Sequence, residues 1–159
     1  MNDFGSAASS EAATDFTCSF VTAKSAEAIY EGVLDVRSWW SENIEGSPRQ
    51  LGGEWVYDNL PVHHTLFRVT ELIPGKRVVW EVLKNQLSSV KDQSEWVGDR
   101  LVFEITSEGD SNRLTFTQEG LTPADQCYAI CDNAWTGYIA GSLRARIEMG
   151  KGSPVTKRS

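Results

Sequence analysis

Apolar and polar residues alternate over 15–22 and through much of 54–119, as they do in strands that bury one face. Tight-turn sequences such as Pro74-Gly75 and Gly109-Asp110 separate the alternating runs. Short runs joined by tight turns predict an antiparallel sheet in which most strands pair with their sequence neighbours. The segments that we expect to form strands are 15–22, 54–58, 62–73, 77–83, 100–106 and 113–119.

Three segments have helical patterns instead. Ser25 is a good N-cap for a helix that runs to about Leu34, and a second short helix is expected over 36–41. The third predicted helix, 123–149, would be about 40 Å long at 1.5 Å per residue. At 100° per residue, one face of this helix holds small and apolar residues, namely Cys127, Cys131, Trp135, Tyr138, Ser142, Ala145 and Met149.

A single amphipathic helix of this length needs an apolar groove, and the concave face of the predicted sheet supplies one. The fold class is therefore α+β with a helix-grip architecture. A curved antiparallel sheet wraps around the long C-terminal helix, and two short helices follow the first strand. We expect one ligand-cavity domain over 15–152, with a disordered leader at 1–14 and a tail at 153–159.

Five sequence blocks, in order along the chain, resemble one bacterial family. They are Trp39-Trp40, Val69–Trp80, Leu101–Ile105, Phe116–Leu121 and Ser142–Arg144. With these blocks the chain resembles the bacterial proteins related to the activator of heat shock protein 90 ATPase, within the START/SRPBCC (birch-pollen-allergen-like) superfamily. The resemblance spans almost the whole predicted domain, and it implies the helix-grip fold that the periodicity predicts independently.

The resemblance implies a cavity but no particular reaction. Members of the superfamily bind lipids, hormones or polyketides, and some act as cyclases or aromatases. A eukaryotic branch binds and activates the chaperone, where the resembling domain is part of a longer protein. A chaperone or another protein is thus the second kind of partner that the resemblance implies, and the oligomeric state stays open.

Charge and composition narrow the classes of function. The chain has 159 residues and a formal net charge of −7, which argues against nucleic acid or an anionic membrane as a partner. No apolar run approaches the roughly 20 residues needed to span a bilayer, and the N-terminus lacks the features of a signal peptide. We therefore expect a cytoplasmic protein in which Cys18, Cys127 and Cys131 are reduced and bind no metal.

Six tryptophans are many for a chain of this length. Each one alone fits an ordinary core position, while the group fits the walls of a pocket for a ring or an acyl chain. Gln118 shares its parity with Leu114 and Phe116, so it is an inward polar group suited to orienting a ligand. The predicted ligand-binding residues are Trp40, Trp55, Tyr57, Phe67, Trp80, Phe103, Phe116, Gln118, Trp135, Tyr138 and Ser142.

Candidates for acid–base chemistry are few. His63 and His64 are adjacent on a strand and point to opposite faces, so they cannot share a metal. No other ligand spacing indicates a metal site, and no motif indicates a cofactor. Glu71 shares the parity of His63 and therefore faces inward if no bulge intervenes. An inward carboxyl would be buried, and burial would raise its pKa. Glu71 and His63 are the weak catalytic candidates.

The sequence leaves three functions open, and the lack of a catalytic constellation puts binding first. The first hypothesis is that the chain binds a small apolar or amphipathic molecule between sheet and helix, with no reaction assigned. One alternative is a cyclase-, aromatase- or hydrolase-like enzyme in the same cavity, and the other is a co-chaperone-like interaction module. Small residues at 142 and 145 opposite an aromatic sheet predict empty volume, so Ser142→Trp should fill the cavity and leave the fold intact.

Overall fold

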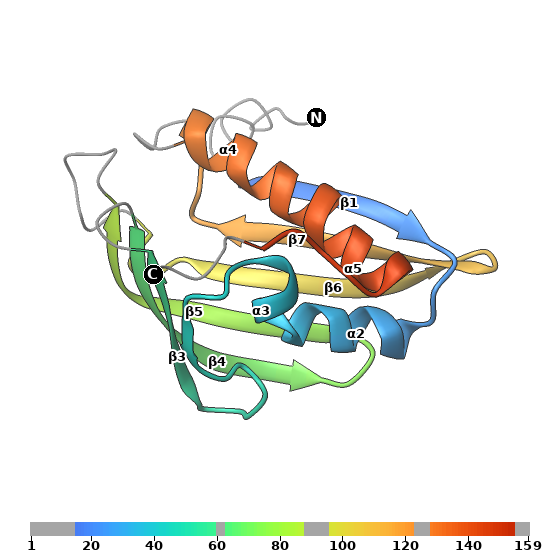
Figure 1. Cartoon of the computed structure of the whole chain (residues 1–159), viewed down its shortest axis with the longest axis horizontal. Helices are drawn as coiled ribbons and strands as arrows, with labels where there is room; N and C mark the ends of the chain where they lie inside the picture. The colour runs from blue at the N-terminus through green and yellow to red at the C-terminus, as the bar shows by residue number, and fades with distance from the viewer. Residues whose placement is uncertain (1–14, 60–62, 88–95, 123–127, 155–159) are drawn as a thin grey trace, which may run out of the picture.

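The computed structural model describes residues 15–59, 63–87, 96–122 and 128–154. In these residues one antiparallel sheet of seven strands has the order β1-β7-β6-β5-β4-β3-β2. The sheet curves strongly, and the C-terminal helix lies along one of its faces (Figure 1). The strands are β1 (Phe16–Thr22), β2 (Ile44–Gly46), β3 (Glu54–Asn59), β4 (His63–Ile73), β5 (Arg77–Leu87), β6 (Arg100–Glu108) and β7 (Ser111–Glu119).

Strand alternation follows the predicted pattern closely in β6 and β7. Phe103 and Phe116 are opposite each other in the register and both are fully buried, and Leu101 is opposite the equally buried Gln118. Cross-strand pairs of this kind hold the register, because a shift by one residue would turn every buried side chain outward. The helix-grip class predicted from the sequence is confirmed.

Two strands differ from the prediction in extent. β5 continues to Leu87 rather than to 83, because its polar second half pairs with the first half of β4. β2 was not predicted at all. Its three residues pair with 55–57 of β3 at the edge of the sheet, and three residues are too few to show an alternation.

Two helices after β1 match the prediction. They are α2 (Ala26–Leu34) and α3 (Val36–Trp39), and the Ser25 hydroxyl caps α2 by accepting a hydrogen bond from the Ala28 backbone N–H at 3.1 Å. Both helices lie beside the C-terminal half of the last helix (Figure 1). This arrangement closes one end of the space between sheet and helix.

The C-terminal helix has three parts: α4 (Tyr128–Thr136), a π-helical segment η1 (Gly137–Leu143) and α5 (Arg144–Met149). The predicted helix began at 123, and 123–127, with Cys127, lie outside the described residues. The helix ends at Gly150, whose φ of 84° is the left-handed conformation typical of a glycine helix end. No described helix is long and apolar enough to cross a bilayer.

The π-helical segment changes which side chains face the sheet. In a regular α-helix, a row of every fourth residue drifts around the axis by about 40° per step. The π-helix turns less per residue and offsets this drift. The face predicted at 100° per residue is therefore wrong at its end, since Met149 is 77% exposed and Ala145 is only partly buried. The buried row is Cys131, Trp135, Ile139, Leu143 and Ile147.

A glycine sets the distance between α2 and α5. A Cβ atom on Gly32 would lie only 2.6 Å from Cγ1 of Ile147. The missing side chain lets the two helices touch, and both Gly32 and Ile147 are buried. The helix–helix contact thus closes the domain at this end, while aromatic side chains fill the space toward the other end.

Candidate functional site

The aromatic residues predicted to line a site meet in one cluster between the sheet and the C-terminal helix. Trp40 lies near its centre, with ring centroids 4.7 Å from Tyr57, 5.2 Å from Trp135 and 5.8 Å from Trp55. Neighbouring rings of the cluster are 4.6 to 6.3 Å apart. Its members are Trp39, Trp40, Trp55, Tyr57, Phe67, Trp80, Phe103, Phe116, Trp135 and Tyr138.

Gln118 extends this aromatic cluster with a polar contact. Its side chain is fully buried, its Oε1 accepts a hydrogen bond from Nε1 of Trp135 at 2.8 Å, and its Nε2 donates to Asp99 at 2.9 Å. An ionised Asp99 carboxylate can only accept hydrogen bonds, so the amide nitrogen of Gln118 must face Asp99 and the amide oxygen must face Trp135. Gln118 therefore holds the Trp135 indole in place, in the inward position predicted from its parity.

His63 is a second polar group of this interior and is largely buried. Its Nε2 contacts Asn85 Oδ1 at 2.9 Å and Thr65 Oγ1 at 2.8 Å, and Thr65 in turn donates to Asn85. The ring proton therefore resides on Nε2. Burial lowers the pKa of His63 to about 4, the hydrogen bond to Asn85 opposes this shift, and the nearby His64 adds to it. The imidazole is thus neutral at pH 7.

Trp96 connects the two polar residues, because it contacts both His63 and the Trp135 ring that is bonded to Gln118. It was not among the predicted ligand-binding residues. Its ring stacks on Trp135 at 5.9 Å and meets His63 edge-on at 4.8 Å, and the residue is 5% exposed. Its φ of 84° is the only positive φ among the described non-glycine residues. For a bulky residue this conformation costs roughly 1–3 kcal/mol. The only signal in the sequence was an aromatic residue just before the turn at Gly98.

Four indole N–H groups of this interior have no hydrogen-bond partner. They are buried and belong to Trp40, Trp55, Trp80 and Trp96. More than nine in ten buried polar groups in proteins are paired, so four such groups in this cluster and the adjoining Trp96 are unusual.

Glu71 does not belong to the site. Its carboxylate is 38% exposed and pairs with the Arg77 guanidinium at 2.9 Å. The register between β4 and β5 shifts between Val69 and Glu71, which marks a bulge. A bulge reverses the parity of the residues after it, so the expectation of an inward, shielded Glu71 is wrong.

Ser142 is buried, and its hydroxyl is used in hydrogen bonds within the protein. Its hydroxyl donates to the Trp39 carbonyl at 2.7 Å and accepts from the Ser153 backbone N–H, also at 2.7 Å. A Cβ on Gly152 would lie 2.7 Å from the Ser142 carbonyl. Residues 152–153 therefore pack against the helix at Ser142, and this contact, rather than a cavity facing the aromatic sheet, accounts for the small residue there.

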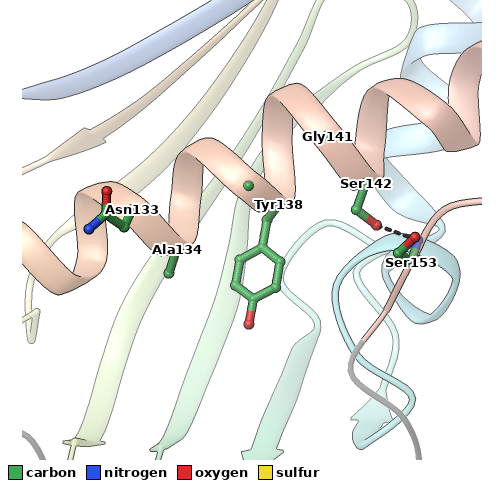
Figure 2. Close-up of a pocket in the computed structure, with 7 residues that line it drawn as sticks. Asn133, Ala134, Tyr138, Gly141, Ser142 and Ser153 are labelled. Atoms are coloured by element: carbon green, nitrogen blue, oxygen red, sulfur yellow. Dashed lines mark hydrogen bonds between the residues drawn. The ribbon is translucent and has the colours of Figure 1, made fainter.

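An open groove of about 480 Å³ runs along the π-helical segment. In Figure 2 the side chains of Ala134, Tyr138 and Ser142 project from the same side of the helix, and Ser142 is bonded to Ser153. Tyr138, a member of the cluster, also lines this groove, and its ring lies 6.3 Å from Trp40 and 6.1 Å from Trp135. The lining residues are Asn133, Ala134, Gly137, Tyr138, Gly141, Ser142 and Ser153.

The two cysteines in the described residues, Cys18 and Cys131, take no part in this site. Cys18 lies on β1, and burial, with a smaller contribution from Asp132, raises the pKa of its thiol to about 11. Cys131 is buried in the core. Among the described residues, no group of three or more His, Cys, Asp or Glu side chains is arranged to hold a metal ion.

Comparisons with known proteins agree on the fold. The Aha1 dimer from Colwellia psychrerythraea is 22% identical, with a TM-score of 0.71 over 87% of this chain and 99% of that one. DynU16, a protein of the dynemicin biosynthetic locus, is 15% identical, with a TM-score of 0.63 over 86% of this chain and 48% of that one. CalU16 from Micromonospora echinospora is 12% identical, with a TM-score of 0.57 over 84% and 76%.

These identities are low enough that the solved structures show a common fold alone. No match was found among the curated proteins. The sequence model described as Activator of Hsp90 ATPase homolog 1-like protein matches residues 24–148, which is most of the chain. The chain therefore belongs to the Activator of Hsp90 ATPase homolog 1-like family.

Proposed function

We propose that this protein binds a small apolar or amphipathic molecule between the sheet and the C-terminal helix. The molecule enters through the groove beside the π-helical segment and contacts the aromatic cluster behind Tyr138. The observation that carries this proposal is the position of the groove. The half-buried Tyr138 lines the groove, and its ring lies 6.3 Å from Trp40 and 6.1 Å from Trp135 of the cluster.

The two glycines in the groove support an opening at this place. Gly137 and Gly141 are exposed, and a Cβ on either would meet no atom within 4 Å. Packing therefore does not require glycine at these positions, although each glycine inside a helix costs about 1 kcal/mol relative to alanine. The π-helical segment adds a second irregularity, of a kind that is frequent at functional sites. Both features are accounted for by a groove that must stay open.

For the enzyme alternative, His63 is the one catalytic candidate that remains in the described interior. Glu71 lies on the outer surface, and Gln118 cannot transfer protons at neutral pH. His63 is inside, but a base with a pKa of about 4 is weak at pH 7. A binding role therefore ranks ahead of a reaction.

The alternative of a protein-interaction module has no surface feature in its favour within the described residues. Leu51, Ile73, Val97 and Met149 are the large apolar side chains that are exposed there. They lie on four separate segments, and single exposed apolar residues are normal on protein surfaces. Family membership is compatible with either kind of partner, and the cytoplasmic location expected from the sequence stays a prediction.

Binding of the uncharged dye N-phenyl-1-naphthylamine, which fluoresces in apolar surroundings, tests the proposal. We expect saturable binding at one site per chain for the wild type and for Gly141→Ala. Gly141→Leu should place a branched side chain in the groove and slow association several-fold, with thermal stability confirming that it is folded. Native mass spectrometry would also show whether a small molecule copurifies. A wild type that binds no dye, or equal association rates for Gly141→Ala and Gly141→Leu, would contradict the proposal.

A further inference from the structure

The unpaired polar atoms in the interior are all of one kind. In the described part of the chain, the buried side-chain nitrogen and oxygen atoms without a partner are the Nε1 atoms of Trp40, Trp55, Trp80 and Trp96. An indole N–H can only donate a hydrogen bond. Among the side chains of the described interior, the unpaired polar atoms are thus all donors.

Pairing is possible in this fold, because other buried groups achieve it. Nε1 of Trp39 donates to the Val33 carbonyl at 3.2 Å, and Nε1 of Trp135 donates to Gln118 at 2.8 Å. Leaving a buried donor unpaired costs stability, since the group loses its hydrogen bond to water and gains none in return. The unpaired indoles therefore call for an acceptor that comes from outside the protein.

One molecule could meet several of these donors. The ring centroids of Trp40 and Trp55 are 5.8 Å apart, and those of Trp55 and Trp80 are 4.7 Å apart. Trp96 is connected to the same group through Trp135, which lies 5.2 Å from Trp40. The rings that carry these donors thus belong to one continuous aromatic region.

The charges around this region favour an uncharged ligand. None of the described charged side chains is fully buried, so a carboxylate in the interior would lack a counter-charge. Asp99 stands at the polar end beside Gln118 and would repel an anion there. A cationic amine would be attracted by the indole ring faces but repelled by their N–H edges, and it too would lack a buried counter-charge.

We propose a chemical class for the ligand, and this inference rests on the proposed function. The ligand is an uncharged, flat apolar molecule whose polar groups are hydrogen-bond acceptors, such as ketone, quinone or ester carbonyls. The aromatic rings provide faces for the flat frame. The indole N–H groups of Trp40, Trp55, Trp80 and Trp96 donate to its carbonyl oxygens.

A matched series on one tricyclic frame tests this class. Fluorene, 9-fluorenone, 9-aminofluorene and fluorene-9-carboxylate are titrated into the full chain by calorimetry, and each affinity is corrected for the compound's partition between water and cyclohexane. We expect fluorenone to bind about tenfold more tightly than fluorene, as one added hydrogen bond gives, which is about 1.4 kcal/mol. The amine and the carboxylate should bind more weakly than fluorene.

Single Trp→Phe variants locate the donor. Phenylalanine keeps a ring but lacks the N–H, so at one or more of positions 40, 55, 80 and 96 it should abolish the preference for fluorenone while fluorene still binds. Trp39→Phe is the matched control, because its N–H is already bonded to Val33 and lies in the same cluster. The control should keep the preference.

The outcomes separate the two proposals. If no compound binds, the small-molecule site itself is wrong and this inference falls with it. If fluorene binds as tightly as fluorenone after correction, the site stands and the ligand class is overturned. That result would mean that the indole N–H groups point at neighbouring ring faces, as the edge-on contact of Trp55 and Trp80 allows.

Discussion

The two ends of the C-terminal helix contact the rest of the protein in different ways. At the α5 end, Ile147 packs directly on Gly32, and Arg146 donates hydrogen bonds to Asp35 at 2.9 Å and to Ser38 at 3.1 Å. The contact is close, and its polar groups are paired. This end has the features of a core that serves stability.

The α4–η1 end has features that each reduce stability. Trp96 holds a left-handed backbone conformation, several indole donors are unpaired, and Gly137 and Gly141 are exposed within the helix. These irregularities come from separate segments of the chain, yet they surround the same aromatic cluster. Local departures from good folding rules that gather at one place are expected at functional sites. The comparison therefore supports a binding role for this end of the helix.

Ser142, between the two ends, should give the largest effect. Ser142→Trp would break the hydrogen bonds to Trp39 and Ser153 and would press a large ring against Gly152. We expect a loss of at least about 3 kcal/mol, from overpacking of roughly 1–3 kcal/mol and about 1 kcal/mol per lost hydrogen bond. Urea unfolding measures it.

Ser142→Ala is the control for this change, because it removes the hydroxyl without adding volume. It should cost less than Ser142→Trp, about 1–3 kcal/mol. A tryptophan variant as stable as the wild type would show that the ring fits into the groove that Ser142 lines, without displacing residues 152–153. That result would move part of the binding site toward the α5 end.

The sequence predicted the fold better than the contacts within it. Alternation in β6 and β7 and the Ser25 cap are local patterns, so one sequence suffices to read them. The bulge that turns Glu71 outward depends on pairing between β4 and β5, and the π-helical turn that exposes Met149 depends on tertiary packing. Such one-residue irregularities leave no periodic signal, and they reverse which face a residue takes.

His63 should produce the next largest effect, as a dependence of stability on pH. Its pKa is about 4 in the folded protein against an ordinary value of 6.5. Between these values the unfolded chain binds a proton that the folded protein does not, so stability is lost as pH falls from 6.5 toward 4. The slope is at most about 1.4 kcal/mol per pH unit, or about 3 kcal/mol in all.

The measurement is urea unfolding between pH 5 and 7, where most carboxylates are already ionised. His63→Gln should show a flatter dependence than the wild type, and His64→Gln, on the neighbouring position, should keep most of the wild-type slope, because burial is the largest cause of the His63 shift. Equal slopes for the wild type and His63→Gln would mean that water reaches His63 when the protein is folded. The polar end would then be open to solvent rather than part of a shielded site.

The inward positions of the candidate residues could be predicted where the residues share a strand parity or a helix face. The aromatic residues from β3 to β7 and Gln118 do lie together. Trp96 was missed because its inward position comes from a turn with positive φ, which propensity disfavours for tryptophan. The groove was missed because it depends on two absent side chains, Gly137 and Gly141, and on the helix geometry between them.

The smallest effects compare glycines at the two ends directly. Gly32→Val should destabilise the protein by roughly 1–3 kcal/mol, because even a Cβ would lie 2.6 Å from Ile147. Gly141→Ala should instead stabilise it by up to about 1 kcal/mol, because nothing contacts the added methyl and alanine favours the helix. Thermal and urea unfolding of both variants measure the difference. If Gly141→Ala destabilises the protein, the π-helical segment itself requires glycine, and the open groove loses its explanation as a feature kept for binding.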